Sequence, residues 1–388
     1  MKKIFLKSRF NGIPLHGLYS ELIKNPPTGY IFYTNSTKPN QLSRIGGKYH
    51  NYLYKQMLYR FGAVPYIIAQ SRNSFIDMPN YDLVYASQHL LTSKKPWIVD
   101  LEYVNALVGY CDISIIKNII TKKLSSDSCK AIMPWSDWAR ETLLGSIDSK
   151  KFKEKIQVLR YTVSPKNTVR LEEDKSVIRM LFLGSMNPGN VLSYEFKGLY
   201  ETIDAFIELQ KKYDDLELVV RSIVPDIVKE KCKKYQNIKI LETPLTPIQL
   251  ENLFRSSDIF PHSGFEVLNL SVLEAMSYGI PIIATSLYSV PEAIQHMKNG
   301  LLIDLPYLKP FYTKYNTPND HSKSFLDNMR KIRPFMIEKI KESMKILIED
   351  SALRMRLGRE ASMNIERGEF SIKKRNNLLK TILETATK

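Results

Sequence analysis

The sequence has few cysteines and no long apolar segment. Its three cysteines, Cys111, Cys129 and Cys232, are odd in number and far apart among 388 residues, so they predict neither a disulfide framework nor a zinc site. We expect reduced thiols. No apolar run approaches the ~20 residues that a membrane-spanning helix needs, and the basic start lacks the apolar stretch of a signal peptide. We therefore expect a cytoplasmic protein.

Acidic residues are also scarce relative to basic ones, which gives a net charge of +16. Residues 1–163 hold 23 Lys and Arg against 11 Asp and Glu, and the rest of the chain holds 33 against 29. Most of the excess, +12, therefore belongs to the first half. A nucleic-acid-binding protein would carry such charge, but the sequence contains no recognised nucleic-acid-binding motif, and charge alone is weak evidence.

Short β-type runs alternate with amphipathic helical stretches, a pattern typical of parallel α/β folds. The length favours two domains. We expect a first domain over 1–163, a linker over 164–177, a second domain over 178–370 and a last helix over 371–388. The expected strands are 29–34, 65–69, 82–87, 96–102, 130–136, 156–160, 178–184, 216–222, 238–242, 258–263 and 281–286. The expected helices include 47–62, 136–145, 199–213 and 246–257.

One stretch, "FPHSGFEVLNLSVLEAMSYGIPIIATS" over 260–286, places two glutamates around a strand-to-helix turn. Glu266 lies on the turn, and Glu274 lies in the helix, which we expect to end at Gly279. The free backbone N–H groups of a helix N-terminus are suited to a diphosphate. A nucleotide-sugar fits, with its phosphates on the helix end and a carboxylate for the hydroxyls of each sugar.

This stretch resembles the E-x7-E motif of retaining glycosyltransferases of family 4. The resemblance extends from about residue 29 to 388, and it is thin before residue 130. It implies the GT-B architecture, in which two Rossmann-like, doubly wound domains face a central cleft. The matching residues are Pro261, Ser263, Glu266, Glu274, Ala275, Met276, Gly279, Pro281, Ala284 and Thr285.

The resemblance also implies donor-site residues before this motif. Gly184 and the pair Lys197-Gly198 match the family, and Lys197 is the expected diphosphate-binding lysine. Ser185 stands where the family usually has an arginine. Arg221 ends the next predicted strand and is a candidate replacement for that missing cation; a solvated or ion-paired arginine is the alternative interpretation.

Further positions follow from the same resemblance. Gly46 and Gly47 are similar to the family's Gly-Gly loop, which lets the backbone approach a ligand. Bulky residues follow Glu266 where the family has small ones, but the backbone N–H groups of Asn269 and Leu270 remain available to the donor. Glu102 occupies the place of a family histidine and is expected to accept a hydrogen bond from the transferred sugar; a capped or ion-paired strand-end glutamate is the alternative. His89 is a weaker candidate.

The implied activity is the transfer of a hexose-type sugar from a UDP-sugar or GDP-sugar to a glycan or lipid-linked acceptor. It needs no metal, which agrees with the lack of any Asp-x-Asp, and no other cofactor. A nucleotide-sugar-binding protein and an epimerase of the same shape are alternatives. The segment 306–335, rich in aromatic and basic residues, is interpreted as a lid or an acceptor contact.

The basic first half also suggests an anionic membrane surface as a partner. The stretch "DISIIKNIITKKL" over 112–124 is amphipathic, and we expect Ile115, Ile116, Ile119 and Ile120 to face one way beside Lys117, Lys122 and Lys123. The tyrosine-rich helix 47–62 is a second candidate. Ordinary core helices with basic outer faces are the alternative interpretation.

Overall fold

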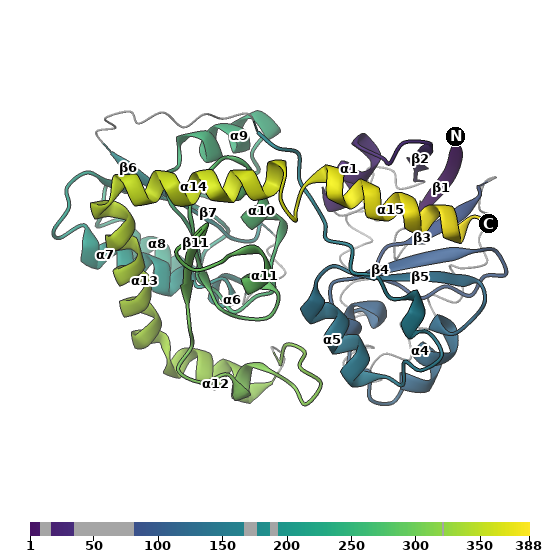
Figure 1. The fold of residues 1–388 in the computed structure, drawn as a ribbon. Helices are drawn as coiled ribbons and strands as arrows, with labels where there is room; N and C mark the ends of the chain where they lie inside the picture. The colour runs from purple at the N-terminus through teal and green to yellow at the C-terminus, as the bar shows by residue number, and fades with distance from the viewer. Residues whose placement is uncertain (8–16, 35–80, 167–176, 187–192, 320–321) are drawn as a thin grey trace. The chain divides into compact units, whose positions relative to one another are not determined.

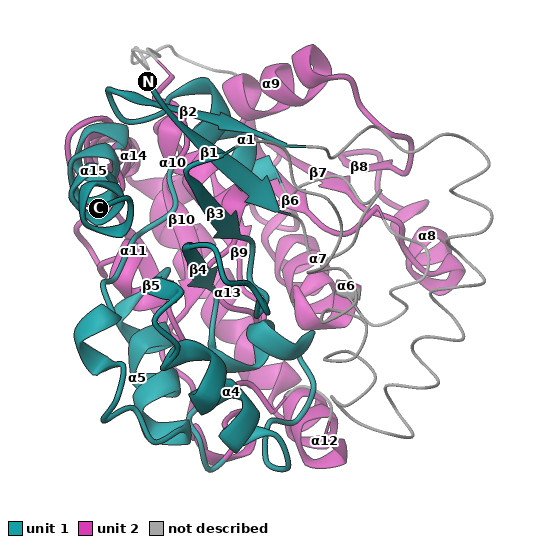
Figure 2. Ribbon diagram, turned by 90° about the vertical axis from the view of Figure 1, so that its right-hand side faces the viewer, with its two compact units in different colours: residues 1–162, 314–317, 372–388 teal, residues 163–313, 318–371 magenta. Residues whose placement is uncertain are grey.

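The computed structural model describes residues 1–7, 17–34, 81–166, 177–186, 193–319 and 322–388 (Figure 1). The chain forms two compact units (Figure 2). Unit 1 comprises Met1–Thr162, Lys314–Thr317 and Ile372–Lys388, and unit 2 comprises Val163–Thr313 and Pro318–Ser371. The predicted strand 65–69 and helix 47–62 lie outside the described residues.

Unit 1 contains a parallel sheet with the strand order β2-β1-β3-β4-β5. The strands are β1 (Lys2–Lys7), β2 (Tyr30–Tyr33), β3 (Leu83–Ala86), β4 (Trp97–Leu101) and β5 (Cys129–Pro134). The sequence analysis missed β1. The predicted strand 156–160 is wrong as a full strand, because this segment makes only an isolated bridge from Ile156 to Ile132 and lies along the edge of β5.

Among the described residues of unit 1, the α-helices are α1 (Gly17–Lys24), α4 (Lys117–Leu124), α5 (Asp137–Ser146) and α15 (Ile372–Ala386). The predicted start of α5 is confirmed: the Oγ of Ser136 caps it by accepting from the N–H of Ala139 at 2.9 Å. Its predicted end is wrong, because Gly145 lies inside the helix.

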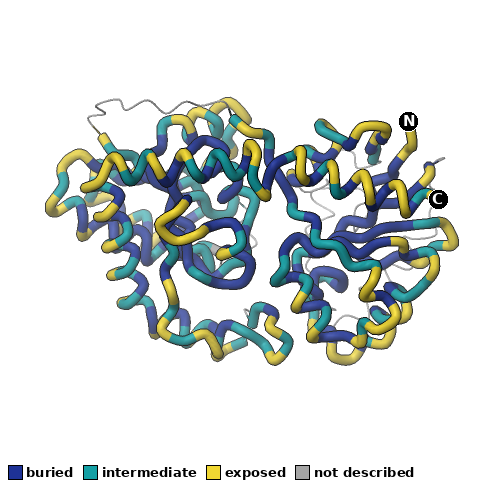
Figure 3. Tube along the Cα trace, in the orientation of Figure 1, coloured by how far each residue is buried: buried dark blue, intermediate teal, exposed yellow. Residues whose placement is uncertain are grey.

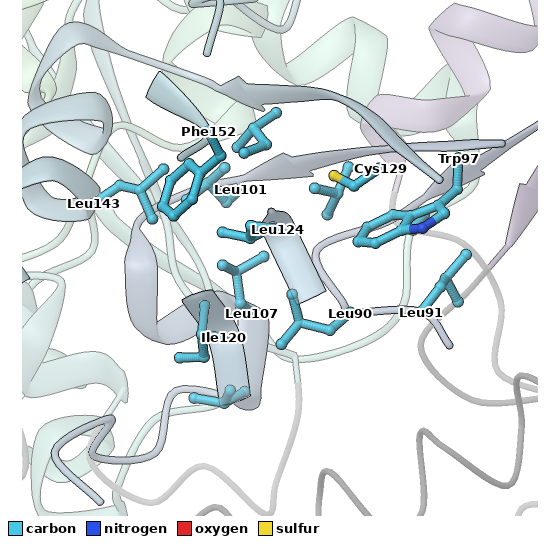
Figure 4. Close-up of a cluster of buried hydrophobic side chains, with 14 of the residues drawn as sticks. Leu90, Leu91, Trp97, Leu101, Leu107, Ile120, Leu124, Cys129, Leu143 and Phe152 are labelled. Carbon is cyan, nitrogen blue, oxygen red and sulfur yellow. The ribbon is translucent and has the colours of Figure 1, made fainter. Parts of the chain in front are cut away.

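A buried apolar cluster joins strands of this sheet to α4 and α5, with Trp97, Leu107, Ile120, Cys129 and Phe152 among its members (Figure 4). Every residue of β3 and β4 is buried, which is why both strands appear in the sequence as nearly continuous apolar runs. All three cysteines are free thiols, and Cys129 and Cys232 are buried.

Unit 2 has two three-stranded parallel sheets, β6-β7-β8 and β11-β10-β9. The strands are β6 (Ile178–Leu183), β7 (Leu216–Arg221), β8 (Ile238–Leu241), β9 (Phe260–His262), β10 (Ile282–Thr285) and β11 (Gly300–Ile303). A bridge between Met180 and Ile259 links β6 to β9. The combined sheet therefore has the strand order β8-β7-β6-β9-β10-β11. Numbered along the chain from β6, this is 3-2-1-4-5-6, the strand order of a Rossmann fold, and the order of the strands reverses between β6 and β9.

The α/β fold with two Rossmann-like units is therefore confirmed. Helices of unit 2 are α6 (Ser193–Phe196), α7 (Leu199–Leu209), α8 (Asp226–Cys232), α9 (Pro247–Ser256), α10 (Leu270–Ser277), α11 (Val290–Ala293), α12 (Lys323–Lys331), α13 (Arg333–Glu349) and α14 (Ser351–Glu366). Buried residues gather along the strands, and most of the exposed ones lie on the helices and loops (Figure 3). Within the described ranges, no helix has the length and apolar character that crossing a bilayer requires.

Helix α15 is held in unit 1 by a buried arginine. The guanidinium of Arg375 donates to the Oγ1 of Thr162 at 3.1 Å and to the backbone oxygen of Asn25 at 2.5 Å. Burial lowers the pKa of Arg375 to about 10, so the side chain stays charged at neutral pH. Charge-assisted hydrogen bonds thus join the last helix to Asn25 and Thr162, which both belong to the segment Met1–Thr162 of unit 1.

Candidate functional site

An ion pair between Lys197 and Glu266 lies at the centre of the candidate site in unit 2. Lys197 is in the turn between α6 and α7, and Glu266 is in the turn between β9 and α10. The Nζ of Lys197 donates to the Oε2 of Glu266 at 2.6 Å, and the two side chains are 18% and 26% exposed. Both charged groups are therefore accessible to a ligand, at an end of β9 where Rossmann folds bind theirs.

Two glycines let these turns approach each other. A Cβ atom on Gly264 would lie 2.2 Å from the backbone oxygen of Phe196, and one on Gly198 would lie 2.8 Å from that of Ser263. Gly198 also has a φ of +76°, which favours glycine. The N–H of Phe265 donates to the oxygen of Phe196 at 2.6 Å and fixes the contact. The distance between Lys197 and Glu266 is thus set by backbone packing.

Aromatic rings support both turns from behind. Phe196 and Phe265 directly precede Lys197 and Glu266, and their rings contact Phe325 at centroid distances of 5.6 and 6.1 Å. Phe311 stacks on Phe265 at 5.1 Å. Phe311 and Phe325 belong to the segment 306–335, for which the sequence suggested a lid or an acceptor contact. In the structure, this part of the segment is a buried support of the site.

Arginines from the same region fix α6 and α7. Arg330 on α12 forms a two-pronged pair with Glu195 at 3.0 and 3.1 Å. Arg333, at the start of α13, donates to Glu201 at 2.9 Å, and Glu201 is almost fully buried. Burial raises the pKa of Glu201, and its bond to Arg333 opposes that rise. These pairs hold the helices on either side of Lys197.

Asn269 connects the ion pair to α10. Its Oδ1 caps the helix by accepting from the N–H of Val272 at 3.3 Å and from the Oγ of Ser271 at 2.6 Å. Its Nδ2 then faces the other way and donates to the Oε2 of Glu266 at 3.4 Å. Asn269 was predicted to contribute a backbone N–H, and the structure adds this role for its side chain. Leu270, the next predicted residue, begins the helix.

His262 was missed by the sequence analysis. It ends β9, is 6% exposed, and places its Nδ1 3.5 Å from the Nδ2 of Asn269. Burial lowers its pKa to about 4; Glu266 opposes this shift, and Lys197 adds to it. The ring is therefore neutral at physiological pH. In the sequence, a functional role for His262 was suggested only by its position just before the turn that carries Glu266.

Gly184, Ser185 and Arg221 form a second group at the carboxyl ends of β6 and β7. The N–H of Gly184 donates to the oxygen of Arg221 at 2.9 Å, and a Cβ on Gly184 would lie 2.1 Å from the Oγ of Ser222. Only glycine fits there. The Nε of Arg221 is buried without a hydrogen-bond partner in the described residues, and burial lowers the pKa of this arginine. Within these residues, no carboxylate pairs with it.

Glu274 lies in the second half of α10 and is partly buried.

Predicted residues of unit 1 lie at the ends of β3 and β4. Glu102 accepts from the hydroxyl of Tyr110 at 2.7 Å. His89 is 1% exposed, with its Nδ1 3.0 Å from the backbone oxygen of Ser87. Gly46 and Gly47 lie outside the described residues.

Asp100, inside β4, is a buried carboxylate that the sequence analysis did not select. It accepts hydrogen bonds from the hydroxyl groups of Tyr19 and Tyr85, the Nε1 of Trp135 and the N–H of Gln88. Gln88 has a φ of +53°, so this bond supports an unfavourable backbone conformation. Burial raises the pKa of Asp100 to about 6, although all four donors oppose the rise.

Comparisons with known proteins agree with the fold. Residues 178–308, about a third of the chain, match the model of the family "Glycosyl transferases group 1". No curated protein matches the sequence.

The described residues contain no group of three or more His, Cys, Asp or Glu side chains that could hold a metal ion.

Three solved structures illustrate the similarity of fold. HepE of Anabaena, in complex with UDP and glucose, has a TM-score of 0.59 and 15% identity, over 99% of this chain and 100% of that one. WaaG, a glycosyltransferase involved in lipopolysaccharide biosynthesis, has a TM-score of 0.55 and 13% identity, over 97% and 99%. TarM has a TM-score of 0.51 and 15% identity, and 79% of this chain spans 55% of that one. These similarities establish the two-domain GT-B fold.

Replacing Gly264 by alanine is expected to separate the two turns. The added Cβ meets backbone atoms, which cannot rotate away, so the variant should lose roughly 1–3 kcal/mol of unfolding free energy. Gly145→Ala is the matched control, because the position is helical with open space, and it should be neutral or gain up to about 1 kcal/mol. Urea unfolding measures both. Equal stability of Gly264→Ala and the wild type would contradict the close contact.

Asp100 predicts a pH dependence of stability. Its pKa is about 6 in the folded protein against 3.8 for an ordinary aspartate side chain, so the folded state holds the proton more tightly. Its contribution is therefore fully present below pH 3.8 and is lost as the pH rises through 6. Relative to Asp100→Asn, the wild type should lose roughly 2–3 kcal/mol of unfolding free energy between pH 4 and 7. A constant difference across this range would contradict the shift.

Proposed function

We propose that the protein is a retaining glycosyltransferase. It moves a hexose-type sugar from a nucleoside-diphosphate sugar, linked to UDP or GDP, to a glycan or lipid-linked acceptor. The observation that carries this proposal is the accessible Lys197–Glu266 pair at the carboxyl end of β9, inside the stretch that matches the glycosyl transferase family. HepE, whose fold is similar, forms complexes with UDP and with UDP-glucose.

The donor diphosphate is bound by positive charge. Lys197 and the backbone N–H groups of Asn269 and Leu270 at the start of α10 contact the phosphates. Gly184 and Ser185 let the backbone approach them, and Arg221, whose Nε lacks a partner in the described residues, supplies the second cation. In this proposal the protein itself neutralises the leaving group, and the reaction needs no divalent metal.

The two glutamates bind the sugars at either end of the donor. Glu266 accepts a hydrogen bond from a hydroxyl of the transferred sugar, and Glu274 accepts one from the ribose. Glu102 of unit 1 is proposed to accept another from the transferred sugar, and its Oε2 already accepts from Tyr110. The acceptor hydroxyl oxygen bonds to the anomeric carbon as the bond to the phosphate breaks, and its proton passes to that phosphate.

Removing the Lys197 cation should impair transfer. Lys197→Ala is expected to lower kcat/KM for the donor about 30- to 1000-fold, the equivalent of roughly 2–4 kcal/mol of transition-state stabilisation. Arg221→Ala should have a smaller effect. Lys211→Ala removes an exposed lysine that pairs only with Glu208 among the described residues, and it should leave the rate unchanged.

Assays of the wild type with UDP-sugars and GDP-sugars separate the alternatives. A transferase forms a product that contains the acceptor and releases the nucleoside diphosphate. An epimerase converts the donor without an acceptor, and a binding protein is stabilised by the nucleotide but releases no sugar. A nucleic-acid-binding protein responds to neither donor. Nucleotide binding without transfer or hydrolysis would overturn the proposed activity.

We further propose that this cytoplasmic enzyme docks reversibly on an anionic membrane through α4. Of the four isoleucines predicted to face one way, Ile116 and Ile120 lie in the core of unit 1, which corrects that prediction. Figure 4 shows Ile120 among the buried side chains. Ile119 on α4 and Ile115 in the turn before it are instead 42% and 72% exposed, and Lys122 is exposed as well. Helix α4 and this turn therefore expose apolar and basic groups together, as membrane docking requires.

Two lysines of this region have partners. The Nζ of Lys123 is partly buried and donates to the Oγ1 of Thr92, so this lysine is a poor membrane contact. The Nζ of Lys117 lies 3.9 Å from the centroid of the Tyr315 ring. Docking should therefore depend on the two exposed isoleucines and Lys122 more than on Lys123.

Liposome co-sedimentation tests the docking. Wild-type protein should bind vesicles that contain anionic lipid, and binding should weaken with added salt. The triple variant Ile115→Ser, Ile119→Ser, Lys122→Glu should bind at least about tenfold more weakly, because it removes apolar contact and reverses a charge. Lys150→Glu, a charge reversal at an exposed site outside α4, is the control. Failure of the wild type to bind anionic vesicles at low salt would exclude the docking.

A further inference from the structure

The side chain of His262 combines deep burial with an unused hydrogen-bonding atom. It is 6% exposed, and its Nε2 has no hydrogen-bond partner in the described residues. Leaving a buried polar atom unpaired costs about 1–3 kcal/mol, so such an atom in a folded protein calls for a specific explanation. Its position at the carboxyl end of β9 suggests a bound ligand as that explanation.

The neighbouring asparagine determines which ring nitrogen carries the proton. The Oδ1 of Asn269 accepts from Val272 and Ser271, so its Nδ2 must be the atom that faces the Nδ1 of His262 at 3.5 Å. Since Nδ2 only donates, the Nδ1 of His262 acts as the acceptor. In the neutral ring the proton then resides on Nε2, and the unused atom is an N–H donor.

This donor lies in the same connected group as the ion pair. One hydrogen of the Asn269 amide points to Glu266, and the other points to His262. Glu266 in turn pairs with Lys197 at 2.6 Å. Lys197 and Glu266 pair with each other, whereas the Nε2–H of His262 is buried and has no partner in the described residues.

We propose that the Nε2–H of His262 donates a hydrogen bond to a hydroxyl oxygen of the sugar moiety of the bound donor. This inference rests on the proposed function and adds a sugar-recognising residue to it. A hydroxyl suits the site because Glu266, which shares Asn269 with His262, is proposed to bind the same sugar. The neutral ring donates without adding charge, so it recognises the sugar and leaves the diphosphate to Lys197.

Two substitutions separate the two ring nitrogens. Glutamine places its amide nitrogen near the position of Nε2 and keeps a donor there, whereas asparagine reaches only as far as Nδ1. His262→Asn is therefore expected to lower kcat/KM for the donor about 10- to 100-fold, and His262→Gln should stay within about fivefold of the wild type. Affinity for UDP or GDP alone should be unchanged in both variants, because the contact is to the sugar.

Donor analogues that lack one sugar hydroxyl each complete the test, and their measurements on the wild type do not depend on any variant folding. With the wild type, one analogue should lose about the same factor as His262→Asn does with the intact donor. With His262→Asn, that analogue should lose nothing further, because the partner of the hydroxyl is already gone. Thermal unfolding of both variants checks that they are folded.

The outcomes distinguish this inference from the proposed function. If the wild type transfers sugar while His262→Asn matches it, or while no analogue shows the non-additive loss, His262 does not bind the sugar. If His262→Asn weakens binding of the nucleoside diphosphate alone as strongly as it weakens binding of the intact donor, the contact is not to the sugar and the inference is overturned. If the wild type neither binds a nucleotide nor transfers sugar, the proposed function itself fails.

Discussion

The contact between two backbone turns is the constraint on which the candidate site depends. Gly198 and Gly264 allow the α6–α7 turn and the β9–α10 turn to touch, so that Lys197 and Glu266 meet at 2.6 Å. Because both side chains are partly exposed, their attraction is moderated by water. In the proposed function, a diphosphate bound at Lys197 shares the lysine with Glu266, and the carboxylate then has spare capacity to accept hydrogen bonds from hydroxyls.

The surrounding protein favours this geometry from two sides. Phe311 and Phe325 support the residues that precede the ion pair, while Arg330 and Arg333 fix the acidic residues of α6 and α7. On the other side, Asn269 joins Glu266 to the first turn of α10. The charged groups need little reorganisation when a ligand arrives, which is a general requirement of electrostatic catalysis.

Local pattern was enough to predict the parallel α/β class, most strands and the position of Glu266, since these depend on alternation and on a motif within 27 residues. It was not enough where tertiary packing decides. Ile115, Ile116, Ile119 and Ile120 form two adjacent helical stripes, and only packing shows that one faces the core. Asp100 lies inside an apolar strand and His262 ends a short one, and a single polar residue in a strand forms no pattern. The support from Phe311 and Phe325 depends on contacts more than 40 residues apart in sequence, which periodicity cannot reveal.

Unit 1 is built from separate segments of the chain, and this has a consequence for biosynthesis. Helix α15 follows the whole of unit 2 in the chain, and the ribosome therefore makes it after unit 2. Until then, the hydroxyl of Thr162 and the carbonyl of Asn25 lack the guanidinium of Arg375, and the apolar surface beneath Leu379 and Leu383 stays uncovered. Unit 2 has its complete sequence by Ser371 and can fold during translation. Unit 1 begins first in the chain, but its described sequence is complete only after that of unit 2.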